Sequence, residues 1–318
     1  AREVDYLKAV RRKGRRRVWL AVLGTLLVLT AAFAAKIFVI GTPLNPDGVG
    51  VSVQREDDVL RVDISSVGSG NAFHGWKVQD EDGIVTITAR SVLVSPLFRD
   101  GTGTVEVPLE GVTEVWLGQA GEGRLIWQED TEISPDAWML YQAQTPYVGD
   151  NSAVGRALAA VDTWYGPPIV DYTISLQTSS EPYGLTIHFD SVTAYTPGAA
   201  DTINERMRIL APVLLALVGN LEEVRWTYTG EDGVAVTHAM ALERADAALP
   251  NWVEAYNTVR GMDLPALESI KDYAASPAAM QQLLDLALFG FYGIGESGNL
   301  TSFGWVDDLP AEQPTFVS

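Results

Sequence analysis

Three histidines are the side chains of this sequence best suited to acid–base chemistry: His74, His188 and His238. A neutral imidazole titrates near physiological pH and binds metals through either ring nitrogen. No two of the three stand at the short spacings that place two imidazoles on one metal. His188 alternates with Ile187 and Phe189, so it is expected on the polar face of a strand. The histidines therefore predict neither a metal site nor a catalytic base.

Other catalytic signatures are missing from the sequence as well. The glycines of residues 68–76 do not form a phosphate-binding G-x-G-x-x-G motif, because position 73 is Phe, and no Walker loop occurs. Residues 295–298 fail the spacing of a nucleophile elbow. The absence of cysteine excludes thiol catalysis, cysteine-ligated zinc and disulfide bonds. We expect no cofactor and no enzymatic activity. An extracytoplasmic enzyme acting on cell-wall glycan or peptide is the alternative, since carboxylates are plentiful.

An apolar run from Val18 to Ile40 decides on which side of a membrane the other residues act. As a helix its twenty-three residues span about 34 Å, enough for a hydrocarbon core of about 30 Å. Residues 1–17 carry eight basic and two acidic side chains. By the positive-inside rule this tail is cytoplasmic and residues 41–318 are extracytoplasmic at the cell membrane. The alternative is a cleaved signal peptide, because Ala32 and Ala34 flank Phe33 in a small-x-small pattern; cleavage near Ala34 would release a secreted protein.

The charge of the chain limits its partners. The whole chain has 22 basic and 41 acidic residues. Eight basic and two acidic residues precede Val18, and one further basic residue, Lys36, lies in the apolar run. The part of the chain beyond the run therefore has 13 basic and 39 acidic residues, a net charge of −26. Such a surface repels nucleic acid, and no nucleic-acid partner is expected. The expected partners are the membrane, through residues 18–40, and another membrane or cell-envelope protein.

Residues 49–130 show the pattern of an all-β domain, following a Pro/Gly-rich linker at residues 41–48. Short runs of alternating apolar and polar residues are separated by Gly-containing turns such as Asp82-Gly83. Six or seven such runs predict a small antiparallel sandwich or barrel. Residues 68–76 are expected to form its one long irregular loop. His74 and Trp76 in this loop could line a recognition surface, or could pack back on the sheet.

Residues 147–250 mix helix and strand signals, after a second linker at residues 131–146. Asp150 or Asn151 is expected to cap a helix, and two strand-like runs precede a long helix that ends near Gly219. A hairpin follows, with Val224, Trp226 and Tyr228 in its first strand. The tail beyond this region divides into a helical extension at residues 251–292 and a loose segment at residues 293–318.

Several motifs of this region stand in a specific order: Tyr147-Val148-Gly149-Asp150-Asn151-Ser152, then Leu176-Gln177-Thr178, then Glu181-Pro182-Tyr183-Gly184, then the hairpin at residues 221–236. In these residues the chain resembles domain of unknown function 4825. The resemblance covers about residues 145–250 and implies an extracytoplasmic module of a Gram-positive, Firmicutes-like bacterium. It implies no activity, because the family has none established.

The same motifs supply the candidate ligand or partner surface. A helix amino terminus with exposed amides could hold an anion or a peptide carboxylate beside the two tyrosines, whereas the structural interpretation is a helix cap and a tight turn. Together with the loop aromatics the candidates are Tyr147, Asp150, Asn151, Ser152, Glu181, Tyr183, His74 and Trp76.

These patterns combine into one expected architecture. A single N-terminal transmembrane helix precedes an all-β sandwich or barrel-like domain and an α+β domain with a C-terminal helical extension. The expected function is that of a single-pass anchored module that binds a ligand or protein as sensor, regulator or assembly partner. A purely structural subunit is a further alternative.

Overall fold

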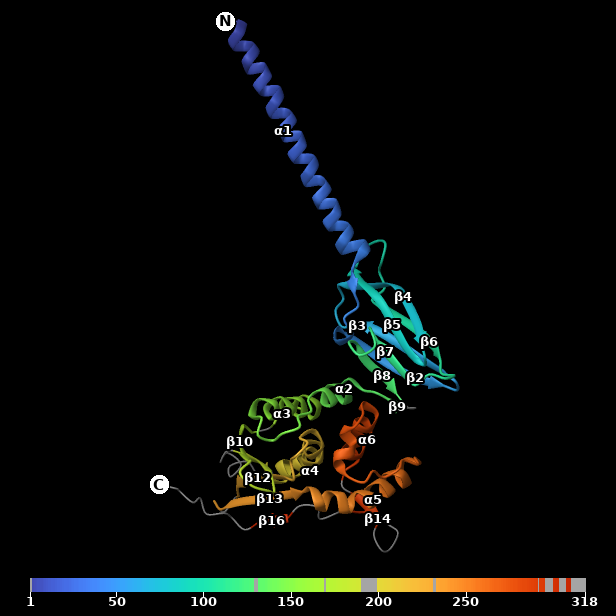
Figure 1. The fold of residues 1–318 in the computed structure, drawn as a ribbon, viewed down its shortest axis with the longest axis vertical. Coiled ribbons are helices and arrows are strands. Elements are labelled where there is room, and N and C mark those ends of the chain that lie inside the picture. Colours follow the sequence, from blue (N-terminus) through green and yellow to red (C-terminus); the bar gives the residue numbers. More distant parts are fainter. Residues whose placement is uncertain are drawn as a thin grey trace. The chain divides into compact units, whose positions relative to one another are not determined.

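The computed structural model describes residues 2–128, 131–168, 170–189, 199–230, 233–290, 292–294, 300–302 and 307–309. The chain forms two compact units, residues 1–126 and 127–318. Figure 1 shows a long helix and a β-rich region in the first unit, and mixed helices and strands in the second. The expected fold class is confirmed as an N-terminal apolar helix, a β-rich region and an α+β region with C-terminal helices.

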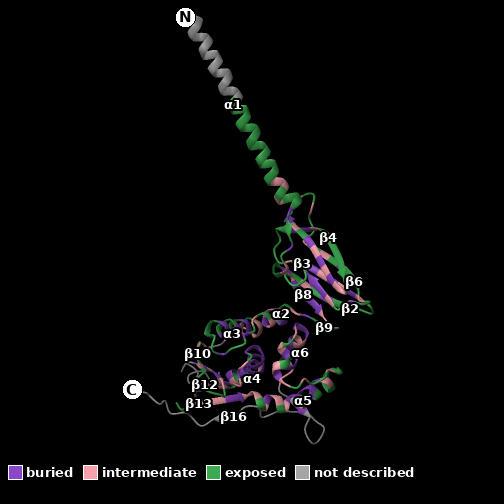
Figure 2. Cartoon of the chain, in the orientation of Figure 1, coloured by how far each residue is buried: buried purple, intermediate pink, exposed green. Residues whose placement is uncertain are grey.

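Helix α1 runs over Arg2–Ala35 and continues as a π-helical turn, η1, over Lys36–Ile40. Its segment Val18–Ile40 is long and apolar enough to cross a membrane, and none of its most apolar window is buried. Figure 2 shows most of this segment exposed, with residues of intermediate burial only near its carboxyl end. A helix that is apolar on all sides is stable in an apolar environment, such as the hydrocarbon core of a membrane, and not in water. It is therefore compatible with a membrane anchor or with a signal sequence.

Strands β1 to β8 form two sheets in the first unit. The strands are β1 (Thr42–Pro43), β2 (Val49–Glu56), β3 (Val59–Ser66), β4 (Asn71–Glu81), β5 (Ile84–Leu93), β6 (Thr102–Pro108), β7 (Glu114–Leu117) and β8 (Arg124–Gln128). One sheet has the order β2-β3-β6, and the other has β1-β5-β7-β8 with β4 paired to β5. All pairs with a resolved register are antiparallel except β5 with β7. Alternate apolar residues, such as Val62 and Ile87, are fully buried, which is what the period of two requires.

Two segments of the first unit differ from expectation. Residues 41–48, expected as a linker, add strand β1 to β5 and include the buried Leu44; the 3-10 turn η2 (Pro46–Gly48) follows. Residues 68–76, expected as an irregular loop, enter strand β4 at Asn71, with a register shift between His74 and Lys77. The glycine-rich pattern thus marks a bulge inside a strand, where the extra residue breaks the alternation that sequence periodicity detects.

The second unit places helices against one face of a mixed sheet. Its elements are β9 (Thr131–Glu132), α2 (Pro135–Gln142), α3 (Asn151–Tyr165), β10 (Tyr172–Gln177), β11 (Gly184–Phe189), α4 (Ala199–Leu217), β12 (Glu223–Thr229), β13 (Ala235–Ala241), α5 (Leu242–Arg260), η4 (Ile270–Ala274), α6 (Pro277–Phe289), β14 (Tyr292–Ile294), β15 (Leu300–Ser302) and β16 (Asp307–Leu309). The sheet order is β10-β11-β12-β13-β16, and only β11 and β12 are parallel among these pairs. Helix α4 packs on β12 and is itself covered by α3 and α6.

Three expectations for the second unit need correction. Residues 131–146 contain helix α2, because Ser134 caps it and Pro135 suits its first turn, so they are no bare linker. The helical extension begins at Leu242 rather than at residue 251, and only η4 and α6 follow α5 as helices. The tail from residue 293 was expected to be loose, yet its described parts pair as strands: β14 with β15, and β16 with β13. Short strands of three residues carry too little pattern for detection from sequence.

Candidate functional site

A groove of about 1000 Å³ lies on the outer face of β4 and β5 in the first unit. Side chains at alternate positions form its floor: Lys77, Gln79 and Glu81 from β4, and Thr86, Thr88 and Arg90 from β5. Their neighbours on β5, such as Ile87, point the other way and are buried. Residues 43–46 and 118–123 form further parts of the lining. The floor of the groove is therefore a strip of mostly polar side chains on the sheet surface, bordered by these two segments.

The floor of this groove carries opposite charges at its two ends. Strand register sets Glu81 beside Ile84 at the β4–β5 turn, Lys77 beside Thr88, and Arg90 beyond it. From residue 84 to residue 90 a strand rises about 20 Å. At the basic end the Arg90 guanidinium donates to the carbonyl of Ile40 at 3.3 Å. The groove thus suits a ligand with a positive group at one end and a negative group at the other.

Strand β4 borders the groove with an unpaired backbone edge. Residues 77–81 are all exposed, and among the described residues β4 is paired in a sheet only with β5. The amides and carbonyls on the free side of such a strand are available to another extended chain. Proteins use charged side chains and bulges, such as the bulge after His74, to prevent unspecific pairing at a sheet edge. We therefore expect this edge to pair only with chains whose side chains match its charges.

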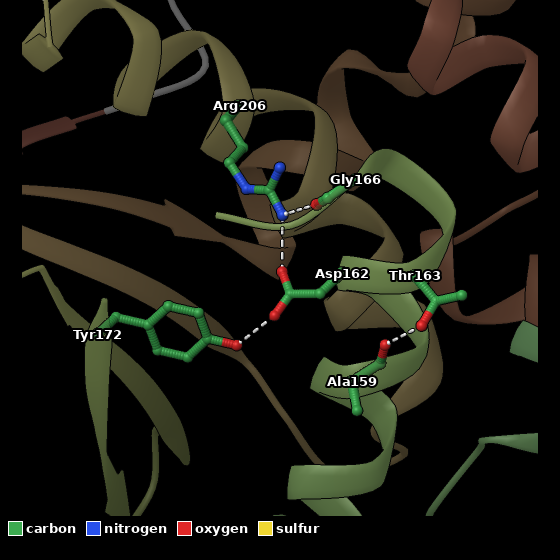
Figure 3. A network of polar contacts seen from close by, with 6 residues as sticks. All are labelled: Ala159, Asp162, Thr163, Gly166, Tyr172 and Arg206. Atoms are coloured by element: carbon green, nitrogen blue, oxygen red, sulfur yellow. Dashed lines mark hydrogen bonds and ion pairs between the residues drawn. The ribbon is translucent and has the colours of Figure 1, made fainter. Parts of the chain in front are cut away.

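A buried polar network ties the helices of the second unit to its sheet (Figure 3). Arg206 on α4 is 7% exposed, and its Nη2 donates to Asp162 on α3 and to the Gly166 carbonyl, both at 2.6 Å. The second oxygen of Asp162 accepts from the Tyr172 hydroxyl at 2.6 Å. Burial and this hydrogen bond raise the pKa of Tyr172, which keeps the hydroxyl a donor. The guanidinium also lies 5.2 Å from the Tyr165 ring centroid. The network is a structural junction, because each group already has a protein partner.

A smaller cavity, of about 390 Å³, lies at the carboxyl end of α4. Lys271 on η4 lines it, and the Lys271 amine donates to the carbonyls of Leu215 and of Val218, the latter at 2.5 Å. The backbone amide of Thr145 donates to the Leu217 carbonyl at 2.9 Å. The last carbonyls of a helix have no partner within the helix, so these donors complete its end. Lys271 is half-buried in a place where its charge complements the helix dipole.

The stability of the protein is expected to rise between pH 8 and pH 9.5 through Lys271. Burial lowers the pKa of Lys271 to about 8, while Asp246 and Glu222 oppose this shift. An unfolded lysine titrates near 10.4, so in this window the unfolded state binds more protons and the free energy of unfolding increases with pH, by up to about 2 kcal/mol. Lys271→Met should lack this increase. Denaturant unfolding of both proteins at several pH values measures it, and identical pH profiles would contradict it.

The motif residues of the second unit gather at the same end of its sheet. Asp150, not Asn151, is the cap of α3, accepting from the Ala153 amide at 2.9 Å. Its own carboxylate therefore occupies the position that a bound anion would need. Tyr147 is 65% exposed at the start of this segment. Asn151 and Ser152 are exposed in the first turn of α3.

The Glu181 turn is linked to that segment through residues 219–222. The Tyr183 amide donates to Glu222 at 3.0 Å, and Asn220 accepts from the Val148 amide at 2.7 Å. Glu181 itself is exposed. The structure thus brings the two motifs together around a shared turn, in which the side chains of Asn220 and Glu222 accept from backbone amides of the motifs.

The remaining predicted residues lie in the first unit and pack on their own sheet. The His74 ring stacks on Phe98 with centroids 4.4 Å apart. Trp76 meets Phe73 edge to face at 5.8 Å, and its ring fills the space that a side chain at Gly103 would need. Both aromatic rings therefore have packing roles within the first unit.

The three histidines lie in three separate places. His188 makes hydrogen bonds to Ser175 at 2.8 Å and to Thr227 at 3.0 Å across neighbouring strands, on the polar face of the sheet. A serine–histidine pair acts as a nucleophile when a carboxylate on the other ring nitrogen stabilises the imidazolium. In this protein the Thr227 hydroxyl, not a carboxylate, contacts that nitrogen of His188. His238 contacts the Tyr228 hydroxyl at 3.0 Å. Within the described residues no three potential metal ligands are grouped.

Sequence reasoning missed both the groove and Lys271. The alternation of apolar and polar residues around Thr86 and Thr88 predicts a strand, but such a pattern cannot show whether other segments of the chain border the polar side chains. Lys271 carried one available signal: beyond Lys36 the chain has only two lysines, Lys77 and Lys271. A single lysine beside apolar Ile270, in a chain so poor in this residue, could have been noted.

Comparison with known proteins identifies one region. Residues 140–240 match the family model described as Domain of unknown function (DUF4825). The resemblance found in the sequence is thereby confirmed for this region. No curated protein and no solved structure matches the chain.

Proposed function

We propose that the protein is a single-pass membrane protein whose extracytoplasmic first unit binds an extended peptide segment of another cell-envelope protein. The apolar span Val18–Ile40 and the basic residues before it support a cytoplasmic amino terminus. The observation that carries the binding function is the groove on β4 and β5, with oppositely charged ends and an adjoining free strand edge.

An extended peptide fits this site better than a compact small molecule does. The floor is about 20 Å long between residues 84 and 90, the length of about six residues in a strand. The free edge of residues 77–81 offers main-chain hydrogen bonds, which every peptide can make. Floor side chains then add selectivity, because Lys77 and Glu81 favour opposite charges in the ligand. The net negative charge of the protein does not prevent this binding, because the groove itself carries both positive and negative side chains.

Exchanging the charges at positions 77 and 81 of the groove is expected to reverse its peptide preference. The double variant Lys77→Glu, Glu81→Lys keeps the net charge and alters two exposed side chains. Two hexapeptides serve as probes. One begins with Lys and ends with Glu, the other begins with Glu and ends with Lys, and both have the same four central residues, in which Val and Thr alternate. The full-length protein in nanodiscs should prefer one of them about tenfold, equivalent to about 1.4 kcal/mol, and the variant should prefer the other. Fluorescence anisotropy of labelled peptides measures both.

A matched swap on another surface provides the control. Arg55→Glu with Glu56→Arg exchanges two exposed charges on β2, which does not line the groove, and should leave the preference unchanged. Peptide binding that ignores the Lys77 and Glu81 reversal, or no binding of either peptide, would refute the proposed site. Mass spectrometry of the mature amino terminus tests the anchor itself, because cleavage near Ala34 would release the protein.

A further inference from the structure

We propose that Lys271 is a covalent acylation site, at which a small acyl donor entering the cavity at the end of α4 transfers its acyl group to the lysine amine. This inference concerns the second unit and is independent of the peptide groove of the first. It rests on how the amine is held, on what surrounds it and on the shape of the cavity.

The amine is held by carbonyls rather than by a carboxylate. Its hydrogen-bond acceptors are the Leu215 and Val218 carbonyl oxygens, and no carboxylate of the described chain lies within ion-pair distance of it. A neutral amine has two N–H groups and can satisfy both carbonyls. Its lone pair then occupies the one remaining position. The geometry therefore accepts the unprotonated, nucleophilic form without losing a hydrogen bond.

The charged groups around Lys271 already bind other donors. Asp246 on α5 accepts from Ser269 and from the Ile270 amide at 2.8 Å. Glu222 accepts from the Tyr183 amide, and Asp272 accepts from the Ser269 amide at 3.0 Å. Their negative charge acts on the amine from a distance and only partly offsets its desolvation, and burial lowers the pKa of Lys271 to about 8.

The cavity that Lys271 lines supplies an apolar site for an acyl chain. The apolar residues of its lining are Pro146, Ala216, Leu217, Ala274 and Ala275. Its volume of about 390 Å³ admits a group of a few carbon atoms. In the reaction the nitrogen attacks the acyl carbon, a C–N bond forms, and the bond to the leaving group breaks with its electron pair. The nitrogen gives one proton to water, and an amide results. Acyl phosphates and thioesters are the donor classes that react in this way.

Acylation would also change the end of α4. An amide nitrogen has one N–H, so one of the two carbonyls, of Leu215 or Val218, would lose its donor. The positive charge at the helix carboxyl terminus would disappear as well. Acylation would therefore remove both a charge and a hydrogen bond from the end of α4.

Trace acetylation of the full-length protein in nanodiscs with methyl acetyl phosphate tests the proposal. Peptide mapping by mass spectrometry compares Lys271 with the exposed Lys77 of the same molecules. Near pH 7.5 a pKa of about 8 makes the neutral fraction roughly two hundred times larger than for an ordinary lysine, and its weaker intrinsic nucleophilicity offsets part of this gain. Lys271 should react on the order of ten times faster than Lys77, and its rate should level off above about pH 8.5. A Lys271 rate below that of Lys77 at every pH would overturn the proposal, since the amine would then be a protonated helix cap.

Two variants test the route through the cavity. Ala275→Trp places a large ring on the exposed side of the cavity lining and should slow the acetylation of Lys271 without changing that of Lys77. Ala159→Trp, at an exposed position of α3, should change neither rate. Equal Lys271 rates in the wild type and in Ala275→Trp would overturn the assignment of the cavity as the acyl site. The wild-type measurement decides the reactivity of Lys271 even where a variant does not fold.

Discussion

Arg206→Ala is expected to lower the free energy of unfolding of the second unit by about 3–5 kcal/mol, because it leaves a half-buried carboxylate without its cation. The guanidinium joins Asp162 and the Gly166 carbonyl, both at 2.6 Å, and is 7% exposed. After truncation the Tyr172 hydroxyl would be the one remaining donor to Asp162 in Figure 3. Guanidinium unfolding of the full-length protein in detergent micelles measures the loss.

A neighbouring arginine on the same helix provides the control. Arg208 is exposed two residues further along α4, and Arg208→Ala should change the free energy of unfolding by less than about 0.5 kcal/mol. The pair Arg206→Ala and Asp162→Asn forms a double-mutant cycle. If the two single losses simply add, the proposed coupling between these side chains is absent.

Trp226→Ala should cost a similar amount, about 3–5 kcal/mol, through loss of apolar contacts and an unfilled cavity. Trp226 on β12 is completely buried, and its indole nitrogen donates to the Asn204 amide oxygen at 2.9 Å. Asn204 in turn donates to the Tyr228 hydroxyl at 2.9 Å. The substitution therefore removes packing and also breaks a polar link between α4 and the sheet. Denaturant unfolding again supplies the measurement.

Two further substitutions separate these contributions. Trp226→Phe keeps most of the ring but leaves the Asn204 oxygen without its donor, so a smaller loss of about 1–3 kcal/mol is expected. Tyr147→Ala removes an aromatic ring that is 65% exposed and should be nearly neutral. Equal losses for Trp226→Ala and Tyr147→Ala would show that burial does not govern the result.

Much of the second unit could be predicted from local patterns. Val224, Trp226 and Tyr228 alternate and are all buried, as a half-buried strand requires. The Ser276-Pro277 pair begins α6, because a serine cap and a first-turn proline act within a few residues of each other. Such signals are local in the chain, so a single sequence contains them. Strand β16 and its pairing to β13 join residues about seventy positions apart, and no local pattern reports such a contact.

The candidate sites show the same division more sharply. Asp150 was recognised correctly as a possible cap, and its bond to the Ala153 amide is local. His74 and Trp76 were recognised as loop residues, whereas strand β4 and the contact with Gly103 assign them to packing. Lys271 had no motif at all, because the carbonyls that it binds lie more than fifty residues earlier in the chain.

By itself the sequence determined the apolar span of residues 18–40, the acidic and cysteine-free remainder, the order of a β-rich region before an α+β region, and the resemblance of residues 145–250. Each of these depends on composition or on the period of a strand or helix, which are properties of contiguous residues. The tertiary structure alone decided where two strands and two loops enclose a groove, and which lysine lies among carbonyls beside a cavity. Those features depend on the register and packing of residues far apart in the chain, and only folding brings such residues together.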